Sequence, residues 1–314
     1  MTRSWKEEYR RSLKSMDTEE HIDLAFYRPI GFMWACLAER FGVSPNAITI
    51  ASIFLGIGAG VLFYFPELWI NVVGMFLLIW ANSFDSADGQ LARMTCQYSR
   101  IGRILDGLSG DFWFASIYIA ICLRENAFEP FFSAHPWLIW VIAIATGVCH
   151  GKQAAMADYY RQFHLYFLKG EEGSELENAA DLRRQLDESG LTWRRNFWRR
   201  LTMRTYLNYT LQQEATAPSM QELRRELHRR FPSGKITQSF RDAFRKASFP
   251  LMKYTNILSF NWRTIWLFAS LFIGQPWLYF IFELTLFNVI AVYMIVRHEK
   301  ICRRFTRELR EGAY

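Results

Sequence analysis

The sequence has few cysteines, and they are not arranged as a metal site or a disulfide framework. Five are scattered over 314 residues, and no two have the Cys-x-x-Cys spacing of zinc sites. We therefore expect reduced thiols. The opening residues, MTRSWKEEYRRSLKSMDTEE, lack the apolar core of a signal peptide, so we expect none. No internal repeat is visible along the chain.

Hydrophobic and charged residues are segregated along the chain. Hydrophobic residues make up 51% of the sequence, yet the mean hydropathy is close to zero, so apolar stretches must alternate with charged ones. Aromatic residues are abundant at 17%, and Trp and Tyr favour the membrane–water interface. The net charge of +7 alone would suit a nucleic-acid-binding protein. With these apolar stretches it instead indicates a membrane protein, and we expect no nucleic-acid partner.

Six segments are candidates for membrane-spanning helices, which need about 20 mainly apolar residues. They cover roughly residues 47–65, 69–84, 105–123, 137 into the 150s, 264–273 and 277–296. Gly274-Gln275-Pro276 is a turn signal that separates the last two. These runs are too long and too apolar for the core of a soluble helical protein. The predicted fold class is therefore all-α integral membrane with six transmembrane helices.

Basic residues are almost absent from one set of loops, where Arg124 is the only one. They are frequent in the N-terminal arm, in the connection between the second and third spans, after the fourth span and in the tail. Because cytoplasmic loops carry the excess of Lys and Arg, we expect all four of these regions to be cytosolic.

The predicted organisation has five parts. They are a cytosolic N-terminal arm with an amphipathic segment (1–44), transmembrane helices one to four (45–158), a large helical cytosolic insert (159–261), helices five and six (262–297) and a cytosolic tail (298–314). Within the insert, Trp193–Leu201 mixes Arg with aromatic residues, which suits an anionic membrane surface. A solvated basic helix packed on the insert is the alternative.

Several carboxylates lie where the second predicted span ends and the third begins. Asp85, Asp88, Gly89 and Ala92 follow i, i+3, i+4, i+7 spacing and share one helix face, and Asp106 lies on the next helix. Carboxylates at membrane depth are costly and usually meet a cation. Ligands that are all oxygen favour Mg²⁺, Mn²⁺ or Ca²⁺. The pattern therefore predicts a divalent metal site.

Arg93 beside these carboxylates suits a phosphate, because its planar guanidinium can bind two oxygens at once. Carboxylates, hard metal ions and an Arg together indicate diphosphate chemistry. One alternative is a set of solvated loop charges. Another is an ion-binding transporter, which would explain the intramembrane carboxylates but not Arg93, Gly102 or the spacing.

This stretch resembles the signature of the CDP-alcohol phosphotransferase (CDP-alcohol phosphatidyltransferase) family, Asp-x2-Asp-Gly-x2-Ala-Arg-x8-Gly-x3-Asp-x3-Asp. Seven positions match in identity and spacing: Asp85, Asp88, Gly89, Ala92, Arg93, Gly102 and Asp106. The segment Ser44-Pro45-Asn46-Ala47-Ile48-Thr49 is similar to a Pro-Asn-x-x-Thr segment that the family often has before its first span. The resemblance covers roughly residues 40–160 and 262–300, which excludes the insert.

The resemblance implies a metal-dependent enzyme that forms a phosphodiester and releases CMP. Two ions, Mg²⁺ or Mn²⁺, would be bound by the carboxylates at positions 85, 88, 106 and 111. The small residues at 89, 92 and 102, together with Arg93, would line the nucleotide site. The partners it implies are a CDP-linked lipid donor, a polar alcohol, membrane lipids and a second copy of the chain.

One position departs from the family pattern. The last Asp should fall at residue 110, but Gly110 stands there and Asp111 follows. In the family that Asp is considered the base that deprotonates the acceptor alcohol, so Asp111 is the candidate catalytic residue. A one-residue shift turns a side chain by about 100° on a regular helix. We therefore expect a π-bulge, which would restore the alignment, with Gly107 and Gly110 making the helix pliable. The alternative is a degenerate base position with weak or lost activity.

The sequence does not fix the donor and acceptor. One branch of the family joins CDP-diacylglycerol to a polar alcohol such as glycerol phosphate, inositol, inositol phosphate or serine. Another joins CDP-choline or CDP-ethanolamine to a lipid alcohol. The first branch is favoured by His150, Lys152 and Arg161, cationic side chains at the end of the fourth span that could bind an acceptor phosphate. Ordinary positive-inside anchoring is the alternative.

Overall fold

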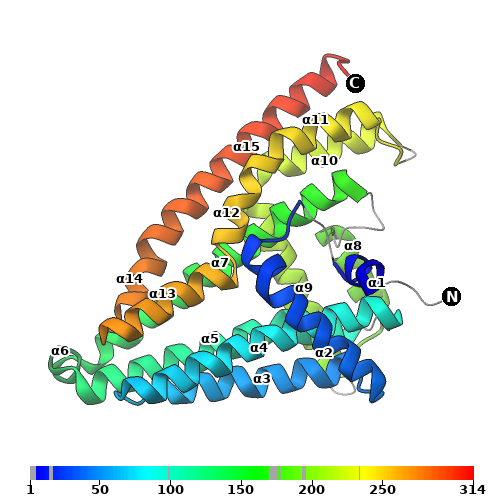
Figure 1. Ribbon diagram of the computed structural model, residues 1–314. Helices are drawn as coiled ribbons and strands as arrows, with labels where there is room; N and C mark the ends of the chain where they lie inside the picture. Colours follow the sequence, from blue (N-terminus) through cyan, green and yellow to red (C-terminus); the bar gives the residue numbers. More distant parts are fainter. Residues whose placement is uncertain are drawn as a thin grey trace. The chain divides into compact units, whose positions relative to one another are not determined.

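The computed structural model describes residues 5–13, 17–97, 100–169, 176, 178–192, 196–232 and 234–314. Every regular element in these ranges is a helix (Figure 1). The chain divides into two compact units. The first contains Met1–Cys149 and Asn261–Thr285, and the second contains His150–Phe260 and Leu286–Tyr314.

The first unit contains most of the long apolar helices. Its elements in chain order are α1 (Trp5–Ser12), the π-helical turn η1 (Asp23–Tyr27), α2 (Arg28–Arg40), α3 (Pro45–Leu62), α4 (Leu68–Thr95), α5 (Arg100–Phe128), α6 (Pro130–Ala134), the first part of α7 (Pro136–Lys169), α13 (Phe260–Ile273), α14 (Leu278–Phe282) and the start of the π-helical turn η4 (Glu283–Phe287).

Four helices are long and apolar enough to cross a membrane: Pro45–Leu62, Leu68–Thr95, Pro136–Leu168 and Leu278–Arg310. They correspond to the first, second, fourth and sixth predicted spans. The third and fifth predicted spans lie in α5 and α13, which are helical but are not among these four. In α13 the reason is its length of 14 residues. The structure thus supports an all-helical membrane protein, while the count of six spans stays a prediction.

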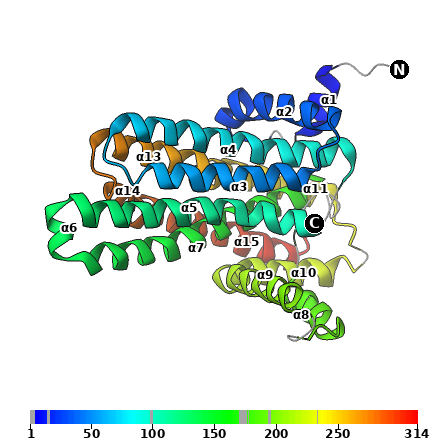
Figure 2. The ribbon, with the colours of Figure 1, turned by 90° about the horizontal axis from the view of Figure 1, so that it is seen from below.

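Helix α3 forms the centre of a three-helix layer with α4 and α5, and the three run side by side in Figures 1 and 2. Ser44 is the N-cap of α3, and its hydroxyl accepts a hydrogen bond from the Ala47 N–H. Pro45 is the first residue of the helix. The Trp113 ring of α5 lies so close to Gly56 that a Cβ there would collide with it. The Trp113 indole N–H donates to the Ser52 carbonyl at 3.0 Å. The missing side chain therefore brings α5 against α3.

The N-terminal arm packs on the part of α4 that follows its most apolar stretch. α2 and η1 contact α4, and α1 contacts both α2 and α4. Ala35 and Ala38 of α2 share a buried cluster with Ala87 and Leu91 of α4. The arm is thus part of the first unit, and it covers one side of the helix that carries Asp85 and Asp88.

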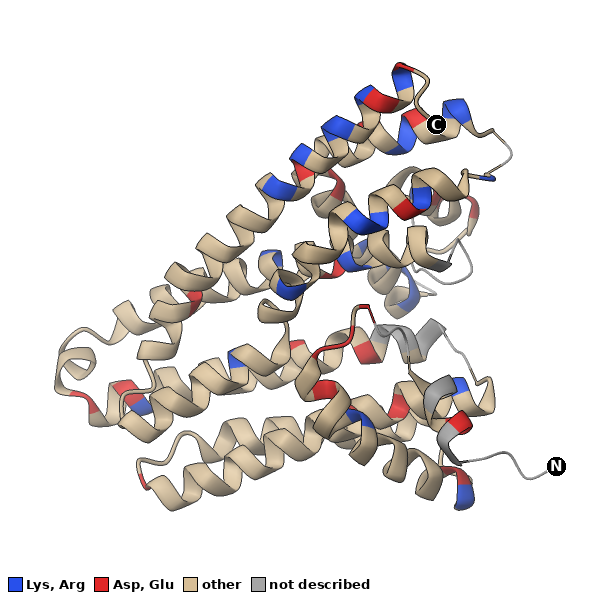
Figure 3. Cartoon of the chain, turned by 45° about the horizontal axis from the view of Figure 1, so that its top comes forward, with Lys and Arg blue, Asp and Glu red and all other residues tan. Residues whose placement is uncertain are grey.

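The second unit contains the rest of the helices. They are the end of α7 from His150, α8 (Ala179–Glu188), α9 (Phe197–Thr216), α10 (Pro218–Arg230), α11 (Gln238–Ser248), the 3₁₀ turn η3 (Phe249–Leu251), α12 (Met252–Ile257) and α15 (Asn288–Arg310). The predicted insert is accordingly helical over its described residues. Trp193, Arg194 and Arg195 lie outside the described residues. In Figure 3, α3 carries no charge, whereas the charged residues of α15 gather in its C-terminal half.

Candidate active site

The structure brings three of the predicted carboxylates together. Asp85 and Asp88 lie on α4, Asp106 lies on α5, and one ligand oxygen from each falls within 4.8 Å of the other two. Asp88 is buried with 4% exposure, Asp85 is half-buried and Asp106 is exposed. The group therefore runs from the protein interior to the surface, and a small ligand can enter from its open side.

Two hydroxyl groups orient the α4 carboxylates. Thr49 on α3 donates its hydroxyl hydrogen to Asp88 Oδ2 at 2.5 Å. Ser109 on α5 donates to Asp85 Oδ1 at 2.7 Å. A hydroxyl fixes a carboxylate without neutralising it. Neither hydroxyl carries a positive charge that would compete with a cation, and neutral groups of this kind commonly orient metal ligands.

The donor set fits a divalent cation of the Mg²⁺ or Mn²⁺ type. All three groups are carboxylates, and hard cations prefer oxygen ligands. Three carboxylates this close would repel one another strongly in a partly buried site without a positive charge between them. We find no other cluster of at least three such ligands in the part of the chain that the structure describes.

Arg93 is attached to the arm as well as to the signature helix. Its Nε donates to the Ser12 carbonyl oxygen at 2.5 Å. A Cβ at Gly89 would be 3.4 Å from Arg93 Nη1, in van der Waals contact with the guanidinium. Gly89 therefore leaves room beside the guanidinium. Ala92 and Gly102, the other predicted nucleotide-site residues, are half-buried.

The expectation of a π-bulge near Asp111 is wrong. α5 is an uninterrupted α-helix from Arg100 to Phe128, and the π-helical turns of the described residues lie elsewhere, in η1 and η4. A Cβ added at Gly107 or Gly110 would meet nothing within 4 Å, so no neighbouring side chain forces the helix to take up an extra residue. Asp111 is exposed and is not one of the three clustered carboxylates. Its role as base or fourth metal ligand stays a prediction.

Comparison with known proteins agrees with the geometry. A family model described as CDP-alcohol phosphatidyltransferase matches residues 42–163, a range that contains the three carboxylates and Thr49. The similarity to this family is confined to that range. The matched range begins in the last residues of the arm and ends inside α7, so it accounts for less than half of the chain.

A curated relative of the phosphatidyltransferase domain is the CDP-diacylglycerol–glycerol-3-phosphate 3-phosphatidyltransferase of Cereibacter sphaeroides. The two are 30% identical over 101 residues, which is 32% of this chain and 42% of the relative. The match therefore spans less than half of the relative's length.

Sequence reasoning missed two residues that orient the carboxylates. Thr49 belongs to the Pro-Asn-x-x-Thr segment, which was noticed for its resemblance but was given no role. Ser109 follows Asp106 by three residues, so it lies near it on α5. Arg28 also contacts Ser86, beside Asp85 in the sequence. Because Arg28 is 57 residues from Asp85, helical spacing could not connect the two.

The cationic residues proposed for the acceptor lie in the second unit, as His150 begins it. Arg161 donates to the Asn256 side chain at 3.3 Å and is half-buried. This hydrogen bond holds Arg161 against a residue of its own unit. Binding of an acceptor phosphate by His150, Lys152 and Arg161 stays a prediction.

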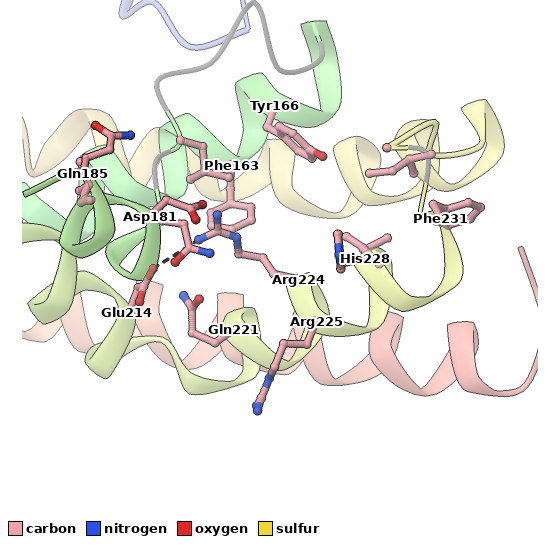
Figure 4. A pocket seen from close by; sticks show the side chains of 16 residues that line it. Phe163, Tyr166, Asp181, Gln185, Glu214, Gln221, Arg224, Arg225, His228 and Phe231 are labelled. Carbon is pink, nitrogen blue, oxygen red and sulfur yellow. Dashed lines mark hydrogen bonds and ion pairs between the residues drawn. The ribbon is translucent and has the colours of Figure 1, made fainter. Parts of the chain in front are cut away.

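The second unit also has a cavity of about 1090 Å³ between α7, α8, α9 and α10 (Figure 4). Arg224 lies over the Phe163 ring, 5.8 Å from its centroid, and is 3.5 Å from the Glu214 carboxylate. No carboxylate of the three-residue group lines this cavity. Because its Arg and Glu already pair with each other, the cavity has no clear preference for an anion or a cation.

Proposed function

We propose that this protein transfers a phosphatidyl group from CDP-diacylglycerol to a polar alcohol and releases CMP. The observation that carries the proposal is the group of Asp85, Asp88 and Asp106 within the matched domain. Three convergent carboxylates, two of them oriented by hydroxyls, suit the binding of cations that in turn bind a diphosphate. A transporter would need the carboxylates but not the signature spacing.

The acceptor that we propose is a glycerol phosphate, an inositol phosphate or inositol. The Cereibacter relative is named for transfer to glycerol 3-phosphate, which favours the branch that uses CDP-diacylglycerol. The cationic residues His150, Lys152 and Arg161 are the proposed contacts for an acceptor phosphate. A transferase that joins CDP-choline or CDP-ethanolamine to a lipid alcohol is the alternative that the donor screen below tests.

The proposed reaction is a single displacement at phosphorus. The acceptor hydroxyl oxygen forms a bond to the phosphorus that carries the diacylglycerol. The bond from that phosphorus to the oxygen bridging to CMP breaks, and CMP leaves with the electron pair. The hydroxyl proton passes to a base. One phosphodiester is formed for each diphosphate bond broken, so no oxidant or other co-reactant is needed.

Each residue of the proposed site has a stated role. Asp85, Asp88 and Asp106 would bind two Mg²⁺ or Mn²⁺ ions, with Asp111 completing the set. Bound ions would neutralise the diphosphate and stabilise the CMP leaving group as Lewis acids. Thr49 and Ser109 hold the carboxylates in place. Asp111 is the proposed proton acceptor, either directly or through one water molecule.

The nucleotide would lie against the small residues of the signature. Gly89, Ala92 and Gly102 would let it approach the helix backbones closely, and Arg93 would contact a phosphate. Arg93 is fixed by its hydrogen bond to Ser12, which costs less ordering on binding than a free side chain would.

A screen of donors and acceptors tests the proposal. The purified protein in detergent is given CDP-diacylglycerol, CDP-choline or CDP-ethanolamine with each acceptor, and CMP is measured with Mg²⁺, Mn²⁺ or EDTA. We expect CMP only with CDP-diacylglycerol and a divalent ion. CMP formed from CDP-choline and diacylglycerol would establish the alternative branch. No CMP from any pair, together with ion transport in vesicles, would establish the transporter.

We also propose that the site and both termini face the cytosol and that the protein is a homodimer. Single cysteines near Pro66 and His135 should react with an impermeant reagent applied to cells, whereas one at Tyr314 should not. Labelling of Tyr314 from outside would reverse the orientation. The mass of the detergent-solubilised protein by light scattering tests the dimer.

A further inference from the structure

The N-terminal arm reaches the signature helix at one close crossing. Gly31 of α2 approaches α4 so closely that a Cβ there would be 2.6 Å from Gln90 Oε1 and 3.0 Å from Ser86. Gln90 donates to the Ser12 hydroxyl at 3.0 Å and to the Arg28 carbonyl at 3.2 Å. The start of α2 is therefore held at a fixed position on α4, beside Asp85 and Asp88.

Arg28, the first residue of α2, contacts α4 at the residue that follows Asp85. Its Nη1 donates to the Ser86 hydroxyl at 3.2 Å, and Ser86 lies between Asp85 and Asp88 in the sequence. Its Nε donates to Glu19 Oε2 at 2.9 Å. The Glu19 side chain is 4% exposed, whereas that of Arg28 is 19% exposed. Glu19 thus fixes the guanidinium while part of it still reaches solvent.

The location of Arg28 is chemically distinctive. Arg28 interacts electrostatically with Asp85, one of the three clustered carboxylates, while it is also paired with Glu19. A guanidinium binds phosphate oxygens through paired N–H groups. Arg28 also lies upstream of residue 42, where the matched domain begins, so the signature does not account for it.

We propose that Arg28 binds a phosphate group of the substrate beside the carboxylate cluster, so that the N-terminal arm supplies part of the binding site. The inference rests on the proposed function. The phosphate could belong to the CDP diphosphate or to a phosphorylated acceptor such as glycerol 3-phosphate, and the two share the same recognition chemistry. A residue that only tied α2 to α4 would stabilise the fold without contacting substrate.

The experiment measures binding rather than turnover alone. The full-length protein in detergent with Mg²⁺ is titrated with CDP in one experiment and with glycerol 3-phosphate in a second. The Kd of each ligand is determined from its thermal stabilisation of the protein. Arg28→Gln removes the charge but keeps an N–H donor for Ser86. Arg28→Lys keeps the charge but loses the paired N–H groups. Arg40→Ala, an exposed Arg at the far end of the same helix, is the control.

We expect Arg28→Gln to weaken binding of one ligand by about tenfold or more, as for the loss of a charge-assisted hydrogen bond. Arg28→Lys should weaken it less, and Arg40→Ala should leave it unchanged. The ligand whose Kd changes is the one whose phosphate Arg28 binds. If Arg28→Gln leaves the Kd of both ligands unchanged, the proposal is overturned, even if the melting temperature of the variant falls. If Arg28→Gln does not fold, Arg28→Lys is the test. Wild-type affinity of Arg28→Lys for both ligands would then overturn the proposal.

The proposed function fails separately. In that case the wild-type protein would bind no CDP in Mg²⁺ and release no CMP. With a wild-type protein that does both, only the role of Arg28 is at stake.

Discussion

Two groups of acidic side chains, one in each unit, are held in different ways. In the first unit, hydroxyl groups of Thr49 and Ser109 contact the carboxylates of Asp88 and Asp85. In the second unit, guanidinium groups contact the acids of α10: Arg229 bonds Glu226 at 2.6 Å, and Arg310 bonds Glu222 at 2.7 Å. The first arrangement keeps negative charge available to a ligand, whereas the second neutralises it within the protein.

We propose that this difference separates carboxylates that bind a metal ion from carboxylates that stabilise the fold. A buried carboxylate that is oriented only by neutral donors costs free energy unless a cation binds to it. Stabilisation of the fold therefore does not explain its position. A carboxylate paired with a largely exposed Arg, as Glu226 is with Arg229, needs no ligand, and such a pair contributes little to stability. Substitutions in the two groups should therefore change different measurements.

The largest effect is expected for Asp88→Asn. It keeps the shape of a buried side chain but removes one of three convergent charges, so CMP release should fall by more than about 100-fold, beyond the usual loss from a residue that only supports a metal ligand. Stabilisation by Mg²⁺ with CDP should disappear as well. Glu222→Gln is the control from the second unit and should leave both unchanged. Full activity of the wild type in EDTA would contradict the metal site.

On the regular helix α5, Asp111 is turned by about 100° from the family's base position, so it would have to accept the proton through a water molecule. In that role, Asp111→Asn should lower kcat by about 10²- to 10⁴-fold, the range for loss of a general base, while CDP still binds. Because α5 is regular, Gly110→Asp combined with Asp111→Gly places the carboxylate where the family pattern has it. Nothing lies within 4 Å of a Cβ at 110, so the swap should fold and be at least as active as wild type. Wild-type turnover of Asp111→Asn would exclude Asp111 as the base.

Thr49→Val should weaken Mg²⁺ affinity by about 10- to 100-fold, because Asp88 loses the hydroxyl that orients it. Thr146→Val is a matched control, since the buried Thr146 hydroxyl donates to the Ile142 carbonyl of its own helix. The metal dependence of CMP release gives both affinities. Equal metal dependence of the two variants would remove Thr49 from the site.

The smallest effect is expected for Arg229→Ala in the second unit. Hydrogen bonds from Arg229 hold the pKa of Glu226 below its usual range. A depressed carboxyl pKa stabilises the fold above the pKa of the unfolded chain, about 4.3, and this contribution disappears as pH falls through the folded-state pKa. The variant should therefore lose less than about 1 kcal/mol at pH 7 and nothing in strong acid, as apparent melting temperatures in detergent would show. A larger loss that persists in acid would mean that packing, not charge, is responsible.

Local patterns were sufficient for the helices and for part of the site. The apolar runs predicted α3, α4, α7 and the helix from Leu278, because a spanning helix must satisfy its backbone and its lipid contacts within one continuous segment. The spacing of Asp85 and Asp88 placed both on one face of α4, since helical periodicity alone decides that relation. Asp106 needed the family pattern to connect it to them.

The sequence by itself determined the helical architecture, the apolar segments and the signature, because each depends on residues within a few turns of one another. Only the tertiary structure decided that Thr49 and Ser109 hold the carboxylates, that α5 runs through Asp111 without a bulge, and that Arg28 lies beside Ser86. The reason is physical. These relations depend on how closely separate helices approach, and that distance is set by side-chain packing at positions such as Gly31 and Gly56, where the absence of a Cβ lets one helix contact another.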